Sequence, residues 1–467
     1  MFIKQFYTNC LSEAAYYIES KGEAAIIDPL RDINEYISMA ADRNATIKYI
    51  FETHFHADFV SGHIDLGRET GAPIIFGPGA VTGFKAHNAA DGEIFTLGGI
   101  TIELMHTPGH TLESSCYLLR DESNKPHAIF TGDTLFVGDV GRPDLSSGDM
   151  TTEELAGIMY DTLQEKILPL ADDVIVYPAH GPGSSCGKNL GPNTFSTIGE
   201  EKAGNYALQP QSREDFIAAV TTGLNAAPRY FAINAQINQQ GYNALSDVKA
   251  RGLKALTVSD FKDKLKEDVI LLDTRPASEF TQGFIPGSIF IGLEGRFAEW
   301  AGSLLPFNKP IILVTPIGKE EETIVRLSRV GFDKMQGYLL GGFEAWKNAG
   351  EKIDLIIDVE ADELMMDMPH DPNLVVLDVR RETEFADGHL KDALNIPLNE
   401  MTDLIHIAQF DDSQNLYVHC AAGYRSVIAS SLMKRQGIHN LRNVLGGWGA
   451  IKIQEKSEIV KEASVLN

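Results

Sequence analysis

Cysteine is scarce in this 467-residue sequence, which contains only Cys10, Cys116, Cys186 and Cys420. Four cysteines in a chain of this length do not form the disulfide framework that is typical of small secreted proteins. We therefore expect a reducing, cytoplasmic setting, in which the thiols stay free for chemistry.

Positive charge is also in short supply, because 65 Asp and Glu residues outnumber 40 Lys and Arg residues and give a net charge of −25. Binding to a phosphate backbone needs clustered positive charge, so we expect no nucleic-acid partner. No apolar run reaches the roughly 18 residues that a membrane span requires. The chain starts with a strand-like pattern, MFIKQF, rather than a signal peptide. We expect a globular protein without membrane contact, with about three domains by length.

Metal-binding side chains follow a short apolar run at residues 47–51 (IKYIF), which predicts a buried strand. His54, His56 and Asp58 then occupy alternate positions. Imidazole nitrogens and carboxylate oxygens are ligands for zinc and iron, and a loop at a strand end can direct them into one cavity. A His-rich surface loop is the alternative interpretation of this stretch when it is considered alone.

Three later loops have the same character and weaken that alternative. His110 lies in MHTPGHT, Asp133 in IFTGDT and His180 in VYPAHG, and each loop follows an apolar run that predicts a strand. The order and spacing of the four loops resemble the metallo-β-lactamase superfamily. The resemblance implies an α/β fold over residues 1–250, an αβ/βα sandwich with its metal at the sheet edges.

One position separates this sequence from the dinuclear members of that superfamily. Their motif is HxHxDH, and here Phe59, which cannot bind a metal, occupies the last position. Asp58, His180 and a bridging Asp133 would form a thin shell for a second zinc, so we expect a mononuclear site. The resemblance then points to the persulfide dioxygenase branch, which holds one Fe(II) per chain.

In that branch the ligands are the first His of the motif, the His of PGH and the Asp of TGD, which correspond here to His54, His110 and Asp133. Two His and one carboxylate leave three positions open on non-haem iron, and dioxygen and a sulfur substrate need such positions. His56, Asp58 and His180 are expected beside these ligands, although direct ligation by His56 stays open.

Two further residues are candidates for contact with the substrate. Arg142, in the loop VGDVGRPD, can bind the carboxylate of a thiol cofactor or pair with Asp139 or Asp144. Cys186 lies in the Gly-rich loop after His180. It either lines the substrate entrance or accepts sulfur, or it is an inert buried thiol. Residues 200–250 should be helical and close this domain, with turns rich in Ala, Asn and Gln at 234–243.

From about residue 256 the chain repeats itself. LLDTR at 271–275 matches VLDVR at 376–380, and LGGF at 340–343 matches LGGW at 445–448, so each pair is 105 residues apart. A repeat of this length, with alternating strands and helices, predicts two copies of a small α/β domain. Both copies, at residues 256–355 and 358–462, resemble rhodanese sulfurtransferase domains.

The two copies differ at the nucleophile. In the second, a predicted strand ends at Cys420, and the loop AAGYR leads into a helix. This CxxGxR pattern surrounds a sulfur anion with backbone N–H groups at a helix N-terminus, and Arg425 adds positive charge that favours the thiolate. In the first copy, Thr315 and Glu320 take the places of Cys420 and Arg425. Residues 256–355 contain no Cys, so we expect this copy only to space or dock the other domains.

Taken together, these features resemble a persulfide dioxygenase–rhodanese fusion. The resemblance implies that a low-molecular-weight persulfide, of glutathione, coenzyme A or a similar thiol, is oxidised by O2 to sulfite. Cys420 would interconvert persulfide and thiosulfate by sulfur transfer. The alternatives are a dinuclear zinc thioester hydrolase of glyoxalase II type and a non-oxidative sulfur carrier. A homo-oligomer is compatible with the sequence.

Overall fold

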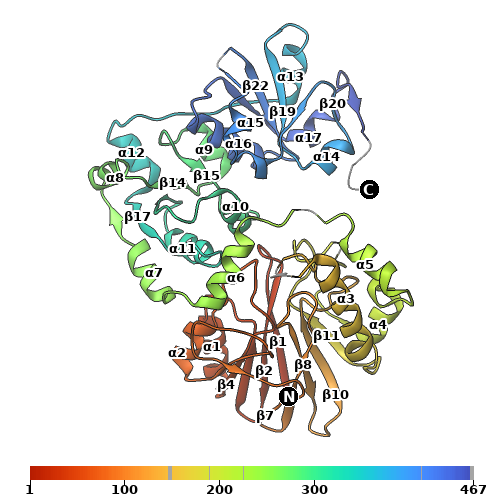
Figure 1. The fold of residues 1–467 in the computed structure, drawn as a ribbon. Helices are drawn as coiled ribbons and strands as arrows, with labels where there is room; N and C mark the ends of the chain where they lie inside the picture. The colour runs from red at the N-terminus through yellow and green to blue at the C-terminus, as the bar shows by residue number, and fades with distance from the viewer. Residues whose placement is uncertain (146–149, 189, 225, 412, 463–467) are drawn as a thin grey trace. The chain divides into compact units, whose positions relative to one another are not determined.

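The chain folds into two units in the computed structural model, which describes residues 1–145, 150–188, 190–224, 226–411 and 413–462. The first unit comprises Met1–Asp247 and Val325–Asp333, and the second comprises Val248–Ile324 and Lys334–Asn467 (Figure 1). Within the described ranges, no helix is both long enough and apolar enough to cross a membrane.

Two six-stranded sheets form the centre of the first unit. In spatial order, the first sheet contains β1 (Phe2–Thr8), β2 (Glu13–Ser20), β3 (Glu23–Ile27), β4 (Thr46–Phe51), β5 (Ile74–Phe76) and β6 (His87–Asn88). The second contains β12 (Ser196–Thr197), β11 (Ile175–Pro178), β10 (Pro126–Gly132), β9 (Ser115–Arg120), β8 (Ile100–His106) and β7 (Ile94–Leu97). The predicted strands before all four metal-type loops are therefore present.

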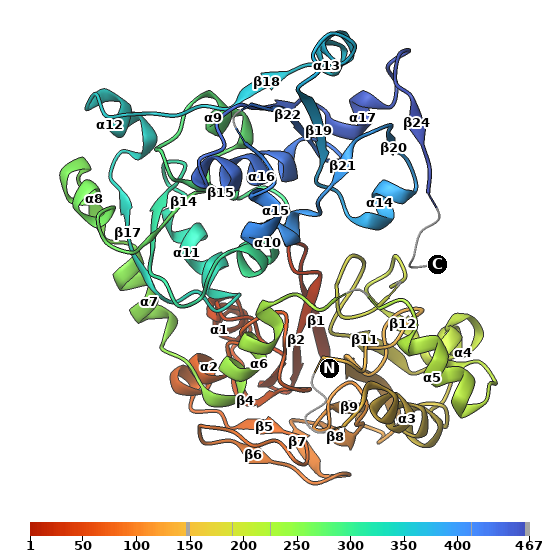
Figure 2. The same cartoon turned by 45° about the horizontal axis from the view of Figure 1, so that its top comes forward.

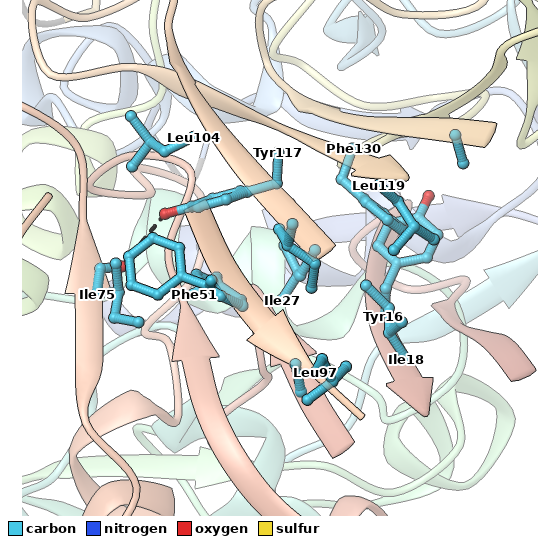
Figure 3. Close-up of a cluster of buried hydrophobic side chains, with 14 of the residues drawn as sticks. Tyr16, Ile18, Ile27, Phe51, Ile75, Leu97, Leu104, Tyr117, Leu119 and Phe130 are labelled. Carbon is cyan, nitrogen blue, oxygen red and sulfur yellow. Dashed lines mark hydrogen bonds between the residues drawn. The ribbon is translucent and has the colours of Figure 1, made fainter. Parts of the chain in front are cut away.

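A shared core joins the inner faces of the two sheets (Figure 3). Side chains alternate along β2, so that Tyr16 belongs to this core and its neighbour Tyr17 belongs to the core on the outer face. The ring centroids of Phe51 and Tyr117 lie 4.6 Å apart. The Tyr117 hydroxyl donates a hydrogen bond to the Glu52 carbonyl at 2.9 Å, which ties this core to the residue before the first metal-type loop.

Helices cover the outer face of each sheet (Figure 2). On the first sheet, Tyr36 of α1 (Asn34–Asp42) and Leu66 of α2 (His63–Thr70) complete one core. On the second, Met159 of α3 (Thr152–Thr162) and Phe216 of α5 (Arg213–Thr221) complete another, with α4 (Ile198–Gly204) in the same region. These three layers of core confirm the predicted αβ/βα sandwich.

The expectation of turns at 234–243 was wrong for most of that stretch, because α6 (Tyr230–Gln240) is a helix. Asn238 lies inside it, and its side-chain amide donates to the carbonyls of His56 and Phe59 at 2.8 and 2.7 Å. Its Oδ1 accepts from the Ser61 N–H at 2.9 Å. Three hydrogen bonds to the metal-type loop outweigh the weak helix propensity of asparagine.

A short segment of the middle repeat, residues 325–333, belongs to the first unit. The Arg329 guanidinium forms a bidentate pair with Asp32 at 2.8 and 2.7 Å, and the Arg329 carbonyl accepts from the Val60 N–H at 2.7 Å. Arg31 is fully buried and donates to Asp333 at 2.8 Å. The Val60 contact fixes the end of the loop that contains His54, His56 and Asp58, and the two ion pairs hold Arg31 and Asp32.

The second unit contains two five-stranded parallel sheets of the same topology and a two-stranded sheet of β20 (His389–Leu390) and β24 (Ile459–Val460). The first has the order β13 (Ala255–Leu256), β17 (Met335–Leu339), β16 (Ile311–Val314), β14 (Ile270–Asp273) and β15 (Ile289–Phe290). The second has the order β18 (Ile357–Val359), β23 (Leu441–Val444), β22 (Asn415–His419), β19 (Leu374–Asp378) and β21 (Leu394–Asn395). The helices between and beside these strands are α7 (Leu245–Gly252), α8 (Val258–Lys264), α9 (Ala277–Gln282), α10 (Phe297–Leu304), α11 (Glu320–Ser328), α12 (Gly342–Asn348), α13 (Ala361–Asp367), α14 (Glu382–Ala386), α15 (Leu404–Ile407), α16 (Tyr424–Arg435) and α17 (Gly447–Ile451).

Both repeats contain the same buried ion pair at the end of their central strand. Arg275 binds Asp273 through Nε and Nη2, the latter at 2.7 Å, and Arg380 binds Asp378 in the same way at 2.6 Å. Each guanidinium also lies over the aromatic ring of its LGGF or LGGW sequence. The segments that reveal the repeat, LLDTR and VLDVR with LGGF and LGGW, therefore stabilise the fold. Any catalytic role must come from other residues.

Candidate functional site

The candidate metal ligands lie on loops that follow four strands of the first unit. His54 follows β4, His110 follows β8, Asp133 follows β10 and His180 follows β11. Ligand atoms of His54, His110 and Asp133 all lie within 4.8 Å of one another, and the three side chains are buried. The structure thus brings together the three residues that the family resemblance implied as ligands.

Two of the histidines are oriented by carbonyl groups. His110 Nδ1 lies 2.8 Å from the Arg142 carbonyl, and His180 Nδ1 lies 3.1 Å from the Ser12 carbonyl. A carbonyl only accepts, so each Nδ1 has the proton and each Nε2 keeps its lone pair. The two Nε2 atoms lie 3.4 and 3.5 Å from the Asp133 carboxylate. Histidines that bind metals are typically held in this way.

His54 is oriented by a hydroxyl and a carboxylate. Asp28 accepts hydrogen bonds from the Thr53 N–H at 2.8 Å and the Thr53 hydroxyl at 2.9 Å. The Thr53 oxygen can therefore accept from His54 Nδ1, which lies 2.9 Å away, and His54 Nε2 faces Asp133 at 3.9 Å. Burial, reinforced by the neighbouring histidines, holds the pKa of His54 well below its usual range. The neutral imidazole is the form that binds a metal.

Asp133 owes its position to Gly132 and fits a bound cation. Gly132 has a φ of +52°, and a Cβ there would lie 2.6 Å from the Thr53 side chain, so only glycine allows this turn. Asp133 is buried, yet neither carboxylate oxygen accepts a hydrogen bond from a described residue. A buried carboxylate without partners is destabilising unless a cation compensates it, and two imidazoles with a carboxylate form a suitable donor set for iron.

Replacing Thr53 by valine should weaken metal binding about 10- to 100-fold, the usual effect of losing such an outer contact. Valine keeps the shape of threonine but leaves His54 Nδ1 without its acceptor. Thr53→Ser retains the hydroxyl and is the matched control, which should bind metal nearly as the wild type does. Competition with a chelator measures both affinities, and equal affinities in all three proteins would contradict the proposed role of Thr53.

His56 points to a different group of side chains. Its Nε2 lies 3.1 Å from Asp28 and 3.6 Å from Glu52. Burial favours a lower pKa for His56, but these carboxylates outweigh it and raise the pKa to about 10. A protonated imidazole has no lone pair for a metal, which supports the expectation that His56 lies beside the ligands and does not bind the ion itself.

A second cluster of possible donors lies next to the triad. Ligand atoms of Asp58, His180 and Cys186 are within 4.8 Å of one another, and His180 Nε2 lies 3.6 Å from Asp58. Burial raises the pKa of the Cys186 thiol well above its usual range. Phe59 is buried against the His56 ring, with 4.4 Å between centroids. Phe59, at the last position of the motif, cannot bind a metal. Cys186 is instead the third possible donor beside Asp58 and His180.

Arg142 forms the ion pair that was one of its two predicted alternatives. Its Nε and Nη2 both lie 2.7 Å from the carboxylate oxygens of Asp144, and the side chain is buried. Its carbonyl also orients His110. Contact between the guanidinium and a substrate stays a prediction.

Glu13 is a buried acid beside the site that the sequence analysis missed. It is fully buried, neither carboxylate oxygen has a hydrogen-bond partner among the described residues, and its backbone pairs with that of His180. Burial raises its pKa well above the usual range. No motif distinguishes Glu13, which is the first residue of an otherwise ordinary strand.

The second candidate site lies in the last repeat, where Cys420 separates β22 from the loop into α16. The buried Cys420 Sγ accepts a hydrogen bond from the Gly423 N–H at 3.1 Å and lies 3.7 Å from Ser426 Oγ. Gly423 has a φ of +105°, a conformation that favours glycine. The N-terminus of α16 adds a partial positive charge, so the loop is suited to hold an anionic sulfur.

Arg425 contributes less net charge to this loop than the sequence alone suggested. Its guanidinium forms a bidentate pair with Glu384 at 2.6 and 2.8 Å. Burial opposes ionisation of Glu384, but the pair with Arg425 prevails and lowers the pKa of that carboxyl. Part of the positive charge expected near the sulfur is therefore neutralised.

The middle repeat has a threonine at the equivalent position. Val314 pairs with Asp273 in the first sheet as His419 pairs with Asp378 in the second. The next residues, Thr315 and Cys420, are therefore equivalent, as the repeat spacing predicted. A threonine hydroxyl cannot form a persulfide, so this site has no sulfur nucleophile.

Comparisons with known proteins agree with this architecture. The model of the Metallo-beta-lactamase superfamily matches residues 8–180, and that of the Rhodanese-like domain matches residues 257–349 and 360–454. The crystal structure of a metallo-beta-lactamase from Staphylococcus aureus subsp. aureus COL is 33% identical, with a TM-score of 0.65, and the match covers 73% of this chain and 98% of that chain. This chain belongs to the metallo-beta-lactamase superfamily.

Further relatives match about half of this chain or less. Hydroxyacylglutathione hydrolase GloC of Haemophilus influenzae is 27% identical over 231 residues, which are 45% of this chain and 97% of that protein. The cytoplasmic hydroxyacylglutathione hydrolase of Arabidopsis thaliana is 32% identical over 184 residues, 38% of this chain and 67% of that protein. ETHE1 from Myxococcus xanthus is 27% identical, with a TM-score of 0.45, over 51% of this chain and 99% of that chain. Here the superfamily domain is followed by two rhodanese-like domains.

Proposed function

We propose that the first domain is an iron-dependent persulfide dioxygenase and that the last repeat is a sulfurtransferase. The overall oxidation is RSSH + O2 + H2O → RSH + SO3²⁻ + 2H⁺, where R is a low-molecular-weight thiol carrier such as glutathione or coenzyme A. The observation that supports it most is the buried triad of His54, His110 and Asp133. The first domain is also fused to a repeat that carries the nucleophile Cys420, and a persulfide substrate explains that fusion.

The donor set of the triad matches one Fe(II) per chain. When bound, the iron would supply open coordination positions at which dioxygen and the terminal sulfur of the persulfide can be brought together. His54 and His110 present neutral Nε2 atoms, and Asp133 contributes a compensating negative charge. Burial of these three side chains restricts access of water to the reacting groups.

The residues around the triad have supporting roles in this proposal. His56, held by Asp28 and Glu52, places a positive charge behind the ligands. Cys186 lies beside Asp58 and His180, where a thiol can contact the incoming persulfide. Arg142, whose carbonyl orients His110, is the candidate for binding a carboxylate of the thiol carrier.

Sulfur transfer in the last repeat requires only a thiolate. The Cys420 sulfur attacks the outer sulfur of a persulfide or thiosulfate, the old S–S bond breaks, and the thiol or sulfite leaves with the electron pair. Cys420 then holds a persulfide. Transfer of its outer sulfur to sulfite, the product of the first domain, regenerates the Cys420 thiol and forms thiosulfate.

Thioester hydrolysis at a dinuclear centre is the second candidate function. Two observations favour it: the Asp58, His180 and Cys186 cluster beside the triad, and the hydroxyacylglutathione hydrolases among the relatives. Thioester hydrolysis does not explain the fusion to a sulfurtransferase repeat, so we prefer the dioxygenase.

Metal analysis combined with oxygen uptake separates these functions. We expect about one iron per chain, as the mononuclear triad implies, and oxygen consumption on glutathione persulfide with sulfite as the product. A glutathione thioester serves as the control substrate and should not be hydrolysed. Two zincs per chain in protein that hydrolyses the thioester and consumes no oxygen would instead establish the hydrolase.

A further inference from the structure

A hydrogen-bond chain connects the middle repeat to the nucleophile of the last repeat. Thr281 Oγ1 of α9 donates to Asp358 Oδ2, and Asn443 Nδ2 donates to Asp358 Oδ1, both at 2.7 Å. Ser426 Oγ donates to Asn443 Oδ1 at 2.7 Å, and the same oxygen lies 3.7 Å from Cys420 Sγ. Four residues thus link the sulfur to a domain that has no nucleophile of its own.

The backbone fixes the members of this chain. Asp358 on β18 lies opposite Asn443 on the adjacent strand β23. The Thr281 carbonyl accepts from the Ile356 N–H at 2.9 Å, so α9 is attached by main chain to the residue before β18 and by side chain to β18 itself. Thr281, Asn443 and Ser426 are all buried. The arrangement therefore belongs to the interior of the fold.

Asp358 determines the direction in which the protons of the chain point. A carboxylate only accepts hydrogen bonds, so Asn443 must turn its NH2 group towards Asp358 and its carbonyl oxygen towards Ser426. The single hydroxyl proton of Ser426 is then used in the bond to Asn443. The Ser426 oxygen can offer only lone pairs to the Cys420 sulfur.

We propose that Asp358, anchored by Thr281, keeps the hydroxyl proton of Ser426 away from the Cys420 sulfur and so keeps that sulfur reactive. This inference rests on the proposed sulfur transfer by Cys420. A sulfur anion that receives fewer hydrogen bonds is more basic, and the rate of attack on an S–S bond rises with the basicity of the attacking sulfur. The middle repeat thereby acts on the chemistry of the last one.

The chain is specific to the last repeat. In the middle repeat, Ala255 lies opposite Tyr338 as Asp358 lies opposite Asn443 in the last repeat, and Glu321 takes the place of Ser426 at the repeat spacing. These residues cannot reproduce the same sequence of donors and acceptors. The nucleophile and the chain that orients Ser426 therefore occur together in one repeat and are both missing from the other.

The charged groups around the Cys420 loop are paired and stay unchanged in the test. Arg425 is bound to Glu384, and Arg380 is bound to Asp378. His419 Nε2 lies 3.8 Å from Asp378, and burial lowers the pKa of His419 despite that carboxylate. A change at Asp358 can therefore be measured against a constant electrostatic background.

Asp358→Asn in the full-length protein tests the proposal. Its amide can donate to Asn443, which can then turn, donate to Ser426 and release the hydroxyl proton towards Cys420. The pH dependence of Cys420 alkylation by iodoacetamide is followed by mass spectrometry of the Cys420 peptide. We expect its midpoint to fall by about one pH unit, the effect of one added hydrogen bond to an anion. Alkylation of the fully ionised thiol should become about three-fold slower.

The Ser426→Ala background distinguishes proton orientation from a general change in charge or fold. Without the hydroxyl, Asp358→Asn should leave the midpoint unchanged, whereas loss of a negative charge alone would act in both backgrounds. An unchanged midpoint in the single variant, or an equal shift in both backgrounds, overturns the proposal. Failure of the proposed function would appear separately, as sulfur transfer retained by Cys420→Ser.

Discussion

Replacing Asp133 by alanine should abolish both iron binding and oxygen uptake. Asp133 is the only carboxylate of the triad, and His110 Nε2 and His54 Nε2 face it at 3.4 and 3.9 Å. Two imidazoles alone would bind Fe(II) weakly and would leave its charge uncompensated. Elemental analysis and an oxygen electrode, with glutathione persulfide as substrate, should both give background values.

Asp58→Ala is the matched control for that variant. Asp58 is also a buried carboxylate next to His180, but it lies outside the triad, so this protein should retain its iron. The fold of Asp133→Ala should survive, because the variant removes a buried carboxylate that has no hydrogen-bond partner among the described residues. Normal oxygen uptake in the Asp133 variant would show that Asp133 is not a ligand.

Replacing Cys420 by serine should abolish sulfur transfer and leave persulfide oxidation intact. A hydroxyl has a far higher pKa than a thiol and cannot hold a persulfide at neutral pH. The variant should keep its iron and consume oxygen on a small persulfide, with sulfite in place of thiosulfate as the main product. Oxygen uptake, sulfite and thiosulfate are measured on the variant and the wild type side by side.

Cys10→Ser controls for the loss of a thiol as such. Cys10 is a free, partly exposed cysteine of the first unit that lies outside both candidate sites, so both activities should persist. A different outcome for Cys420→Ser, in which oxygen uptake disappears along with transfer, would mean that Cys420 delivers sulfur to the iron site. The order of the two reactions proposed above would then be reversed.

The sequence predicted the parts of the metal site that follow from local patterns. The apolar run before His54 formed strand β4, and similar runs placed His110 and Asp133 at strand ends. The network that orients these ligands was not predictable, because its members are remote in sequence. Asp28 acts on His54 through Thr53, and Asn238 binds the same loop from a helix 182 residues after His56.

The choice between ion-pair partners that are close in sequence was equally difficult to predict. Asp139 and Asp144 are both close to Arg142 along the chain, and only the folded loop pairs the guanidinium with Asp144. In the repeats, spacing alone correctly matched Thr315 with Cys420. The hydrogen-bond chain from Thr281 to Ser426 has no such sequence pattern, because it joins different residue types from two copies of the domain.

The Asp133 carboxylate has no hydrogen-bond partner among the described residues, and this affects the stability of the protein in the cell before metal binds. A chain that folds before metal arrives must bury this carboxylate without its cation, whereas the unfolded chain keeps it hydrated. An ion that binds only the folded form shifts the folding equilibrium by about 2.7 kcal/mol at 100 times its Kd. Iron supply would then govern how much of the newly made protein escapes proteolysis, and starvation for the metal would lower its abundance as well as its activity.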